Sequence, residues 1–364
     1  MTETGGPAVV AAIVLAAGEG SRMKSSTPKV LHELCGRTML GHVIAAVRGA
    51  APAQVVVVTG QGRERVEAHL AHIDPDAIAA FQPSQEGTGH AVRIALAALD
   101  AAAGPGLIEG TIIVVPGDAP VLAASSLRAI ADRREETGAA CVLLTANVPD
   151  ADGYGRIVRD DWGRITQVIE HVDATDAELD ITEVNSSVYA FDAATLRLAL
   201  AELTAHNAQG EQYLPDVVRI MVKNADPVEA VVVHDWREIA GVNDRVQLAQ
   251  ARALLRDRIV TSLMRDGVTV IDPATTWVDV GVVAERDCVV LPNTMLLGRT
   301  KIAMGARIGP NCSLTDTVVG AGAVVRDATC EGAHIGPQAT VGPYTYLRPG
   351  TRLARGAKAG GFVE

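Results

Sequence analysis

Residues 9–29, VVAAIVLAAGEGSRMKSSTPK, decide the fold of the N-terminal part of the chain. The apolar run from Val9 to Leu15 predicts a buried strand, and residues 16–20 then form a glycine-rich turn. Such a turn between a strand and a helix offers backbone N–H groups that suit a phosphate chain. Arg22 and Lys29 add two cations beyond the turn. The stretch therefore predicts a phosphate-binding loop in an α/β domain.

Two commoner glycine loops are excluded by the residues themselves. A dinucleotide fingerprint needs glycine at the position of Met23, and a P-loop needs G-K-[ST] where Gly20-Ser21-Arg22 stands. A strand-to-helix turn with a purely structural role stays open as an alternative. The whole string L-A-A-G-x-G-S-R-M, with P-K-V-L downstream, resembles the signature of sugar-1-phosphate nucleotidyltransferases.

The composition limits the class of protein. The 364 residues carry a net charge of −11, which argues against a nucleic-acid-coating surface. No apolar run approaches the ~20 residues of a membrane span, and residues 1–7 lack the basic start of a signal peptide, so we expect a cytoplasmic protein. The cysteines show no C-x-x-C pair and are expected to be reduced and buried: Cys35, Cys141, Cys288, Cys312 and Cys330.

Helical and β-branched segments alternate after the opening loop. Val30 to Val47 has apolar residues at helical spacing, Val55 to Val58 reads as a strand, Ala91 to Leu99 as a helix and Ile112 to Val115 as a strand. This alternation predicts a Rossmann-like α/β domain with a mostly parallel sheet, which we place at residues 1–242. Ligands of such sheets bind beyond the carboxyl ends of the strands.

Two further loops carry candidate ligand-binding residues. In the loop 82–90, Gly87 and Thr88 would let a flat base approach the backbone while Gln82 bonds its edge, although Thr88 as an ordinary helix cap explains the pattern equally well. Asp118 follows the strand that ends at Val115, where a carboxylate is well placed to bind Mg²⁺ with phosphate oxygens. An ordinary turn aspartate is the alternative there.

The C-terminal part changes character. Residues 245–265 lack Gly and Pro and predict one connecting helix, which Gly267 ends, so residues 243–267 are assigned as a linker helix. Residues 268–364 then show an aliphatic side chain on a six-residue period, with an interruption after Leu314, at these positions: Val290, Leu296, Ile302, Ile308, Leu314, Ile335, Val341, Leu347 and Leu353. This period predicts a parallel β-helix of hexapeptide repeats.

The ordered motifs LAAGEGSRM, PKVLH, EGTGHA, GDAP, DGYGRI, IEH, EVN, AQGEQYLPD and GVNDR resemble the bifunctional bacterial N-acetylglucosamine-1-phosphate uridyltransferase/glucosamine-1-phosphate acetyltransferase family, over essentially the whole chain. The resemblance implies a left-handed β-helix, a homotrimer, and transfer of UMP from UTP to N-acetylglucosamine-1-phosphate for peptidoglycan and lipopolysaccharide precursors. It also implies Mg²⁺ on Asp118 and Asn243, with Arg22, Lys29 and Asp118 as the catalytic residues. The substrate-binding residues that it implies are Leu15, Ala16, Ala17, Gly18, Lys29, Gln82, Gly87, Thr88, Gly155, Glu170, Asn185, Asn243 and Arg348.

The sequence departs from the family pattern at three places: Pro116 before Gly-Asp, Ser186-Ser187 after Asn185, and Pro215 before Asp216. These departures concern substrate selectivity rather than the reaction. The chain ends within a repeat coil at Glu364, so we expect a C-terminal truncation that leaves the acetyl-transfer residues out. The histidines, among them His32, His90, His171 and His334, lack metal-ligand spacing and are expected to be surface or structural residues.

Three other functions remain as alternatives. The chain resembles, less closely, thymidylyl- and adenylyltransferases that also carry hexapeptide repeats, and the base loop would separate these from a uridyltransferase. A non-catalytic regulatory subunit of the same layout, or a structural scaffold, is disfavoured because the chain retains Arg22, Lys29, Asp118 and Asn243.

Overall fold

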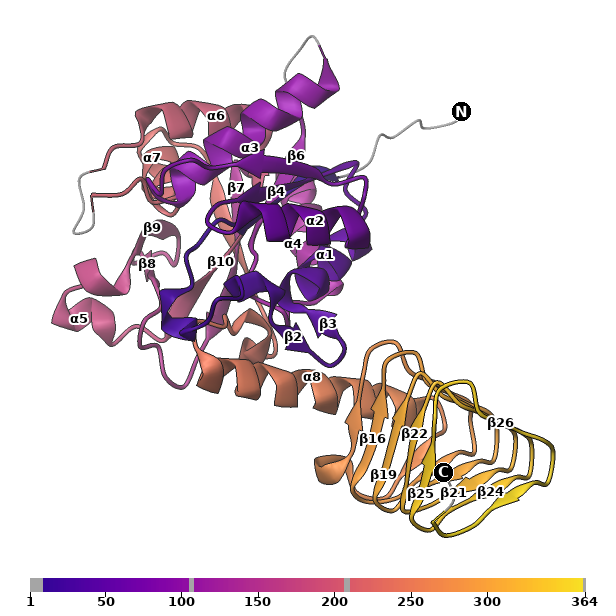
Figure 1. The fold of residues 1–364 in the computed structure, drawn as a ribbon. Coiled ribbons are helices and arrows are strands. Elements are labelled where there is room, and N and C mark those ends of the chain that lie inside the picture. Colours follow the sequence, from indigo (N-terminus) through magenta and orange to yellow (C-terminus); the bar gives the residue numbers. More distant parts are fainter. Residues whose placement is uncertain (1–8, 105–107, 206–209, 363–364) are drawn as a thin grey trace, which may run out of the picture. The chain divides into compact units, whose positions relative to one another are not determined.

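The computed structural model describes residues 9–104, 108–205 and 210–362, and they form two compact units. Unit 1 comprises Met1–His32 and Thr38–Gln247, and unit 2 comprises Glu33–Arg37 and Leu248–Glu364. Unit 1 is an α/β domain and unit 2 is a β-helix preceded by a long helix (Figure 1). This is the predicted architecture of a nucleotidyltransferase domain, a connecting helix and a left-handed parallel β-helix.

Unit 1 is built on a nine-stranded sheet with the order β11-β7-β10-β6-β1-β4-β5, which β8 and β9 extend beside β10. β10 runs antiparallel to both of its neighbours, β6 and β7, whereas β1 pairs in parallel with β4 and β6. The sheet is therefore mixed: the predicted parallel pairing holds for β11-β7, β6-β1, β1-β4 and β4-β5, whereas the pairs made by β10 and the pair β8-β9 are antiparallel. The strands are β1 (Val9–Ala16), β4 (Gln54–Thr59), β5 (Ile78–Phe81), β6 (Thr111–Pro116), β7 (Cys141–Asn147), β8 (Arg156–Arg159), β9 (Ile165–Ile169), β10 (Glu183–Asp192) and β11 (Val228–Val232).

Helices cover both faces of this sheet. The helices of unit 1 are α1 (Met39–Gly49), α2 (Arg63–Ile73), α3 (Thr88–Ala103), α4 (Ala124–Thr137), α5 (Asp176–Leu179), α6 (Ala193–Glu202) and α7 (Asp216–Lys223). Alternate residues of the central strand enter separate cores: Val14 packs with α1, α2 and α4, and Ile13 packs with α3, α6 and α7. Because successive side chains of a strand point to opposite faces, the apolar run from Val9 fills both cores.

The helix predicted over Val30 to Val47 is wrong in its first half. Residues 29–31 form a 3₁₀ turn, η2 (Lys29–Leu31), and a two-stranded hairpin of β2 (Glu33–Leu34) and β3 (Arg37–Thr38) follows before α1 begins. Cys35 and Gly36 at the hairpin turn both have positive φ, 47° and 75°, which a helix cannot accommodate. The Thr38 hydroxyl then accepts the Gly41 N–H at 3.0 Å and caps α1.

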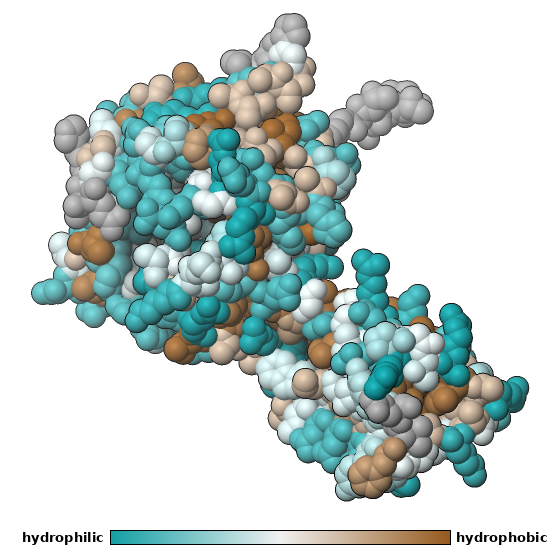
Figure 2. Space-filling view, viewed as in Figure 1, coloured by the Kyte–Doolittle hydropathy of each residue, from teal (hydrophilic) through white to brown (hydrophobic). Residues whose placement is uncertain are grey.

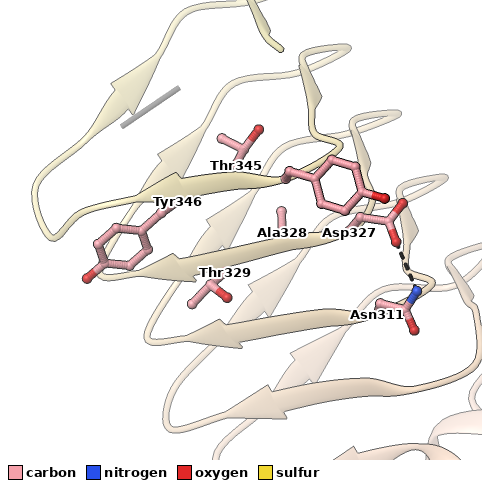
Figure 3. A pocket seen from close by; sticks show the side chains of 7 residues that line it. Asn311, Asp327, Ala328, Thr329, Thr345 and Tyr346 are labelled. Atoms are coloured by element: carbon pink, nitrogen blue, oxygen red, sulfur yellow. Dashed lines mark hydrogen bonds between the residues drawn. The ribbon is translucent and has the colours of Figure 1, made fainter. Parts of the chain in front are cut away.

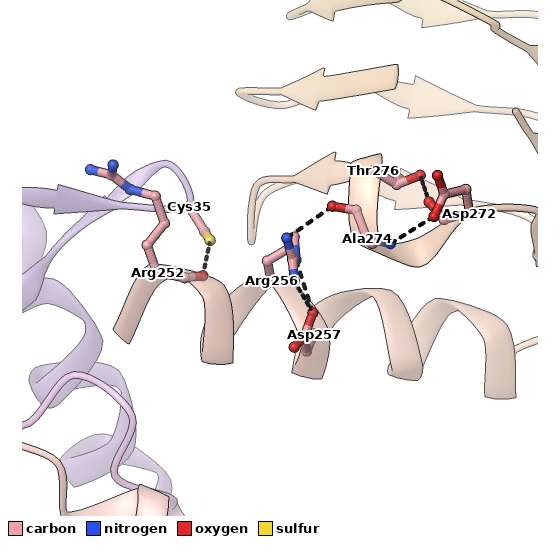
Figure 4. Close-up of polar contacts among 7 residues, drawn as sticks. All are labelled: Cys35, Arg252, Arg256, Asp257, Asp272, Ala274 and Thr276. Atoms are coloured by element: carbon pink, nitrogen blue, oxygen red, sulfur yellow. Dashed lines mark hydrogen bonds and ion pairs between the residues drawn. The ribbon is translucent and has the colours of Figure 1, made fainter. Parts of the chain in front are cut away.

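The hairpin residues belong to unit 2 because they pack on the part of α8 (Arg245–Arg265) that lies in the same unit, from Leu248 onward. The bounds of this helix are the predicted ones. The Cys35 thiol donates to the Arg252 carbonyl at 3.7 Å, and the Cys35 carbonyl accepts the Val280 N–H at 3.0 Å. Figure 4 shows the same helix holding the first coil, where Arg256 donates to the Ala274 carbonyl at 3.0 Å. Tertiary contacts of the hairpin therefore override the helical spacing of its sequence.

Unit 2 winds its short strands into stacked coils with three parallel faces (Figure 1). The first face comprises β12 (Thr269–Val270), β15 (Val289–Val290), β18 (Arg307–Ile308), β21 (Val324–Val325), β24 (Thr340–Val341) and β27 (Lys358–Ala359). The second comprises β13 (Trp277–Val278), β16 (Thr294–Leu297), β19 (Cys312–Thr315), β22 (Ala328–Glu331) and β25 (Thr345–Leu347). The third comprises β14 (Val283–Ala284), β17 (Lys301–Ile302), β20 (Val318–Val319), β23 (His334–Ile335) and β26 (Arg352–Leu353).

The interruption that the sequence shows after Leu314 is not a break in the coil. Val319, Val325 and Cys330 continue the inward row, and all three are at most 1% exposed. Val319, Cys330 and Ile335 each follow the preceding inward residue by five positions instead of six, because three of the turns are shorter. Cys330 pairs with Leu314 on one side and Leu347 on the other, so a cysteine fills an aliphatic place in the core.

The cysteines and the surface agree with the composition. All five cysteines are free and buried, as predicted. On the face shown in Figure 2, hydrophilic residues cover much of the surface and hydrophobic residues form separate patches. Among the described residues, no helix combines the length and the apolar character that crossing a membrane requires.

Candidate active site

The glycine-rich turn leaves its backbone open at the carboxyl end of β1. A Cβ at Gly18 would meet nothing within 4 Å, and the residue is exposed, so the space beside this part of the loop is open. Gly20 has a φ of +64°, and a Cβ at this position would lie 2.6 Å from the Lys29 side chain. The absence of a side chain at Gly20 therefore allows Lys29 to pass close to the loop.

Four polar side chains from distant parts of the chain meet beside this loop. The Lys29 ammonium group lies 2.5 Å from Asp118 Oδ2 and 3.2 Å from Asn243 Oδ1. Arg22 donates to the same Asn243 oxygen at 3.0 Å. The Val242 N–H donates to the Asp118 carbonyl at 2.9 Å, which joins the segment before α8 to the end of β6. The structure thus brings together four residues that the sequence analysis singled out.

The predicted base loop lies next to the phosphate loop. Gln82 follows β5 and is 5% exposed, and its Nε2 donates to the Gly87 carbonyl at 3.2 Å. Gln85 donates to the Ala17 carbonyl at 3.2 Å and so connects the two loops. The alternative prediction, in which Thr88 caps α3, is wrong, because the helix has no side-chain cap. The Thr88 hydroxyl instead accepts the Leu214 N–H at 2.9 Å.

A segment around Gln212, to which the sequence analysis gave no role, fixes the base loop. The Gln212 N–H donates to the Glu86 carbonyl and its own carbonyl accepts the Gly89 N–H, both at 2.8 Å. A Cβ at Gly87 would lie 2.5 Å from the Gln212 carbonyl oxygen, and the φ of Gly87 is +101°. Glycine is therefore required at position 87 by both space and conformation.

The three residues assigned to the sugar also lie together. The Asn185 N–H donates to the Gly155 carbonyl at 2.8 Å, and a Cβ at Gly155 would lie 3.5 Å from Glu170 Oε1. The Asn185 side chain is buried, and its Nδ2 donates to the Tyr189 hydroxyl at 2.7 Å. Ser187 adopts a φ of 60° in the irregular part of β10, and its N–H donates to Asn185 Oδ1.

Acidic side chains lie close to the three residues that are assigned to the sugar. Burial, followed by the charges of Asp173 and Asp216, raises the pKa of Glu170. Burial, followed by the charges of Asp173, Glu211, Glu170 and Asp216, raises the pKa of Tyr213 to about 12. The Tyr213 hydroxyl is buried with no protein partner, so it has hydrogen-bonding capacity left for a ligand. Tyr213 lies in the quoted AQGEQYLPD motif, but nothing in the sequence alone showed its buried hydroxyl.

Two groups of predicted residues lie outside this cluster. Arg348 is exposed after β25 in unit 2. Among the histidines, His32 and His171 each have a buried ring nitrogen without a partner, and His90 approaches Gln82 at 3.3 Å. The part of the chain that the structure describes holds no group of three or more His, Cys, Asp or Glu side chains able to bind a metal.

Residues 12–256 match the family model described as the MobA-like NTP transferase domain. Enzymes with this domain bind nucleotide and sugar-phosphate substrates and generally use a divalent metal ion. The donor set in this molecule fits such an ion. The Asp118 carboxylate and the Asn243 amide oxygen both accept a hydrogen bond from the Lys29 ammonium group. The two oxygens therefore point to one place, where the protein already holds a positive charge. Two protein oxygens suffice where phosphates and water complete the coordination.

The chain is also similar to curated proteins over almost all of its length. It is 54% identical to the bifunctional protein GlmU of Streptomyces coelicolor, over 97% of this chain and 73% of that protein. The identity is 52% to the GlmU protein of Thermobifida fusca and 46% to that of Corynebacterium diphtheriae, with the same shares covered. The chain therefore belongs to the GlmU family and is a nucleotidyltransferase.

Proposed function

We propose that this chain is a UDP-N-acetylglucosamine pyrophosphorylase, which transfers UMP from UTP to N-acetylglucosamine-1-phosphate and releases pyrophosphate. The cluster of Arg22, Lys29, Asp118 and Asn243 at the open phosphate loop carries the proposal. Functionally, we assign residues 1–242 to nucleotidyl transfer, 243–267 to the linker helix and 268–364 to the β-helix. The product serves peptidoglycan and lipopolysaccharide precursor synthesis.

The reaction needs positioning and charge neutralisation more than covalent catalysis. A sugar-phosphate oxygen attacks the α-phosphorus of UTP in line, and the bond to pyrophosphate breaks. The nucleophile is already an anion, so no general base is required. Arg22 stabilises the departing pyrophosphate, and Lys29 neutralises the charge that grows around the α-phosphorus.

We assign the metal as Mg²⁺, held by Asp118 and Asn243. When bound, Mg²⁺ neutralises phosphate charge and orients phosphate oxygens. Lys29 contacts both of these residues, so its ammonium group places a positive charge of the protein beside the two oxygens that would hold the metal.

The substrates are divided between the two sides of the site. Backbone groups at Leu15, Ala16, Ala17 and Gly18 face the nucleotide, and Gln82, Gly87 and Thr88 select uracil. Gly155, Glu170 and Asn185 hold the N-acetylhexosamine, and Glu170 accepts from its hydroxyls. The hydrogen bond from Gln85 to Ala17 supports this division, since it fixes the base loop against the phosphate loop.

We further propose that the β-helix joins copies of the chain into a homotrimer. A groove of about 540 Å³ on its surface is lined by Asn311, Asp327, Tyr344 and Tyr346, among others (Figure 3). Tyr344 is 68% exposed and stacks on Phe362 with ring centroids 5.8 Å apart. An exposed aromatic pair beside a groove suits burial against a second copy. Sedimentation equilibrium that shows only monomer would contradict this assignment.

The free cysteines support a cytoplasmic location, because reducing compartments keep thiols unpaired. The Arg348 side chain is assigned to the sugar-phosphate side of an acetyl-transfer site, as the family resemblance implies.

The direct test of the substrates is identification of the product. The chain is incubated with Mg²⁺, UTP and N-acetylglucosamine-1-phosphate, and the mixture is separated by anion exchange and mass spectrometry. We expect UDP-N-acetylglucosamine and pyrophosphate in equal amounts. Gln82→Leu should weaken the preference for UTP over other nucleotides, while N-acetylglucosamine-1-phosphate remains the sugar substrate. A different nucleotide sugar, or pyrophosphate without a nucleotide sugar, would overturn the proposal.

A further inference from the structure

Three hydrogen bonds hold Asn243 in place, two at its side-chain oxygen and one at its backbone N–H. Its Oδ1 accepts from Arg22 at 3.0 Å and from Lys29 at 3.2 Å. Its backbone N–H donates to Gln247 Oε1 at 2.7 Å, the shortest of the three. Gln247 itself is only partly exposed and touches neither Asp118 nor the cations through any described hydrogen bond. Among the hydrogen bonds of the described residues, Gln247 reaches the cluster through Asn243.

The hydrogen bond from Asn243 to Gln247 arises from the way that α8 begins. The helix starts at Arg245, and the Asp244 carboxylate just before it accepts the Gln247 N–H at 2.8 Å. A glutamine at this place usually returns its side chain to the N–H of the capping residue. Here the side chain reaches one residue further back, to Asn243. The first turn of α8 thus binds the backbone of Asn243 in addition to forming its own N-terminal cap.

The chain before Asn243 is fixed as well. Val242 is buried, and its N–H donates to the Asp118 carbonyl at 2.9 Å. Two successive peptide N–H groups are therefore bonded, one to the loop that carries Asp118 and one to α8. The backbone of Asn243 is therefore fixed on both sides. Its side-chain oxygen already faces the Asp118 side of the cluster, so ligand binding does not have to order this segment of the chain.

We propose that Gln247 is a positioning residue for the metal site, and that it sets the place of the Asn243 oxygen by binding the Asn243 N–H. This inference rests on the proposed function, because it takes Asn243 as a metal ligand. Groups that orient a metal ligand generally change metal affinity by 10- to 100-fold when they are removed.

A cap with only a structural role would behave differently. Its loss would lower the melting temperature and leave metal affinity unchanged, as expected for Thr38→Ala, which removes the cap of α1. The two roles are separated by a measurement of metal binding that does not depend on turnover.

The experiment measures Mn²⁺ binding to the full chain by electron paramagnetic resonance, with α,β-methylene-UTP present to prevent reaction. Gln247→Leu removes the acceptor, and Gln247→Glu keeps an acceptor oxygen at the same place. We expect Gln247→Leu to bind Mn²⁺ about tenfold more weakly and Gln247→Glu to stay within about twofold of the wild type. The apparent KM for Mg²⁺ should rise in parallel for Gln247→Leu.

Further variants keep the outcomes distinct. Asn243→Ala should weaken Mn²⁺ binding at least as much as Gln247→Leu, and wild-type binding in Asn243→Ala would overturn the metal assignment itself. Weaker binding in Asn243→Ala with wild-type binding in Gln247→Leu would overturn the role of Gln247 alone. Should Gln247→Leu fail to fold, Gln247→Ser, whose side chain is too short to reach the Asn243 N–H, gives the same test.

Discussion

The ammonium group of Lys29 lies 2.5 Å from Asp118 Oδ2, although Lys29 follows the first strand of the sheet and Asp118 follows β6. The pair is partly shielded, with 12% of the lysine side chain and 24% of the aspartate side chain exposed. The close contact holds the two side chains together where a triphosphate and a metal ion are assigned. The first two predictions follow from this pair.

Asp118→Asn should reduce kcat by roughly 100-fold or more while the KM for UTP changes little. The carboxylate is assigned to the metal, and loss of one preorganised charge of this kind costs on the order of 10²–10³ in rate. Initial rates of pyrophosphate release give both constants. Asp132→Asn on the exposed side of α4 is the matched control and should be silent. A near-normal kcat in Asp118→Asn would show that the carboxylate is not a metal ligand.

Lys29→Gln should raise the KM for UTP and also lower kcat, since we propose that this cation contacts the triphosphate and neutralises the charge at the α-phosphorus. Lys29→Arg keeps the charge, and we expect it to recover only part of the activity because the broader guanidinium does not fit the same point. The space is tight there, as a Cβ at Gly20 would lie 2.6 Å from Lys29. Full activity in Lys29→Gln would contradict the assignment.

Glu170→Gln should increase stability at pH 7 and weaken binding of the sugar phosphate. Burial raises the pKa of Glu170 in the folded protein, so the folded state favours the protonated form, and stability is lost as the pH rises through that raised value. Glutamine has no such loss. The gain in Tm should therefore be present at pH 7 and vanish below about pH 4, where the carboxyl is protonated in both states.

Thermal melts at the two pH values check the stability, and the KM for N-acetylglucosamine-1-phosphate checks the binding. The KM should rise by roughly 10-fold or more, because a hydrogen bond to a charged group contributes about 1.5–3 kcal/mol. A lower Tm at pH 7 would show that the buried carboxylate is stabilised by partners rather than strained by burial.

Tyr189→Phe should raise the KM for the sugar phosphate about five- to tenfold and leave the KM for UTP unchanged. The phenol accepts from Asn185 Nδ2 at 2.7 Å, and both side chains are buried. Removal of the hydroxyl leaves the amide free to turn and costs about 1–3 kcal/mol of stability for the unsatisfied donor. Equal changes in both KM values would instead indicate general disruption of unit 1.

Ser187→Gly should stabilise the chain by up to about 1 kcal/mol, because a serine with a φ of 60° lies in the left-handed region that glycine adopts without strain. The control is the replacement of a glycine by a larger residue at another position with positive φ. Gly163→Ala, at a φ of +79° with free space around it, should destabilise by about 1 kcal/mol. Denaturant melts give both values, and a destabilising Ser187→Gly would show that the serine side chain has a role of its own.

Local patterns predicted much of the fold. The apolar run before Gly18 and the unbroken segment 245–265 each form the expected element, because both signals lie within a few residues. The hairpin at Glu33–Arg37 was not predicted, since its apolar spacing is helical and only its packing on α8 reveals it. Val319 was also missed, because a turn shortened by one residue shifts the six-residue period.

The candidate site shows the same limit. Strand ends and glycine loops predicted Lys29 and Asp118, and the structure brings these residues together. Tyr189 bonds to Asn185 across a bulge, and Gln247 bonds to Asn243 at the start of a helix. In each pair the partner lies four positions earlier and is only a predicted ligand-binding residue. Such contacts depend on the exact backbone path, which residue spacing alone does not define.

The most direct test of the central claim compares nucleotides. Pyrophosphate release is measured with Mg²⁺, N-acetylglucosamine-1-phosphate and each of UTP, dTTP, ATP, GTP and CTP. We predict release with UTP and background rates with the others. Release with another nucleotide would place the chain among other sugar-1-phosphate nucleotidyltransferases, and no release with any nucleotide would contradict the assignment as a working uridyltransferase.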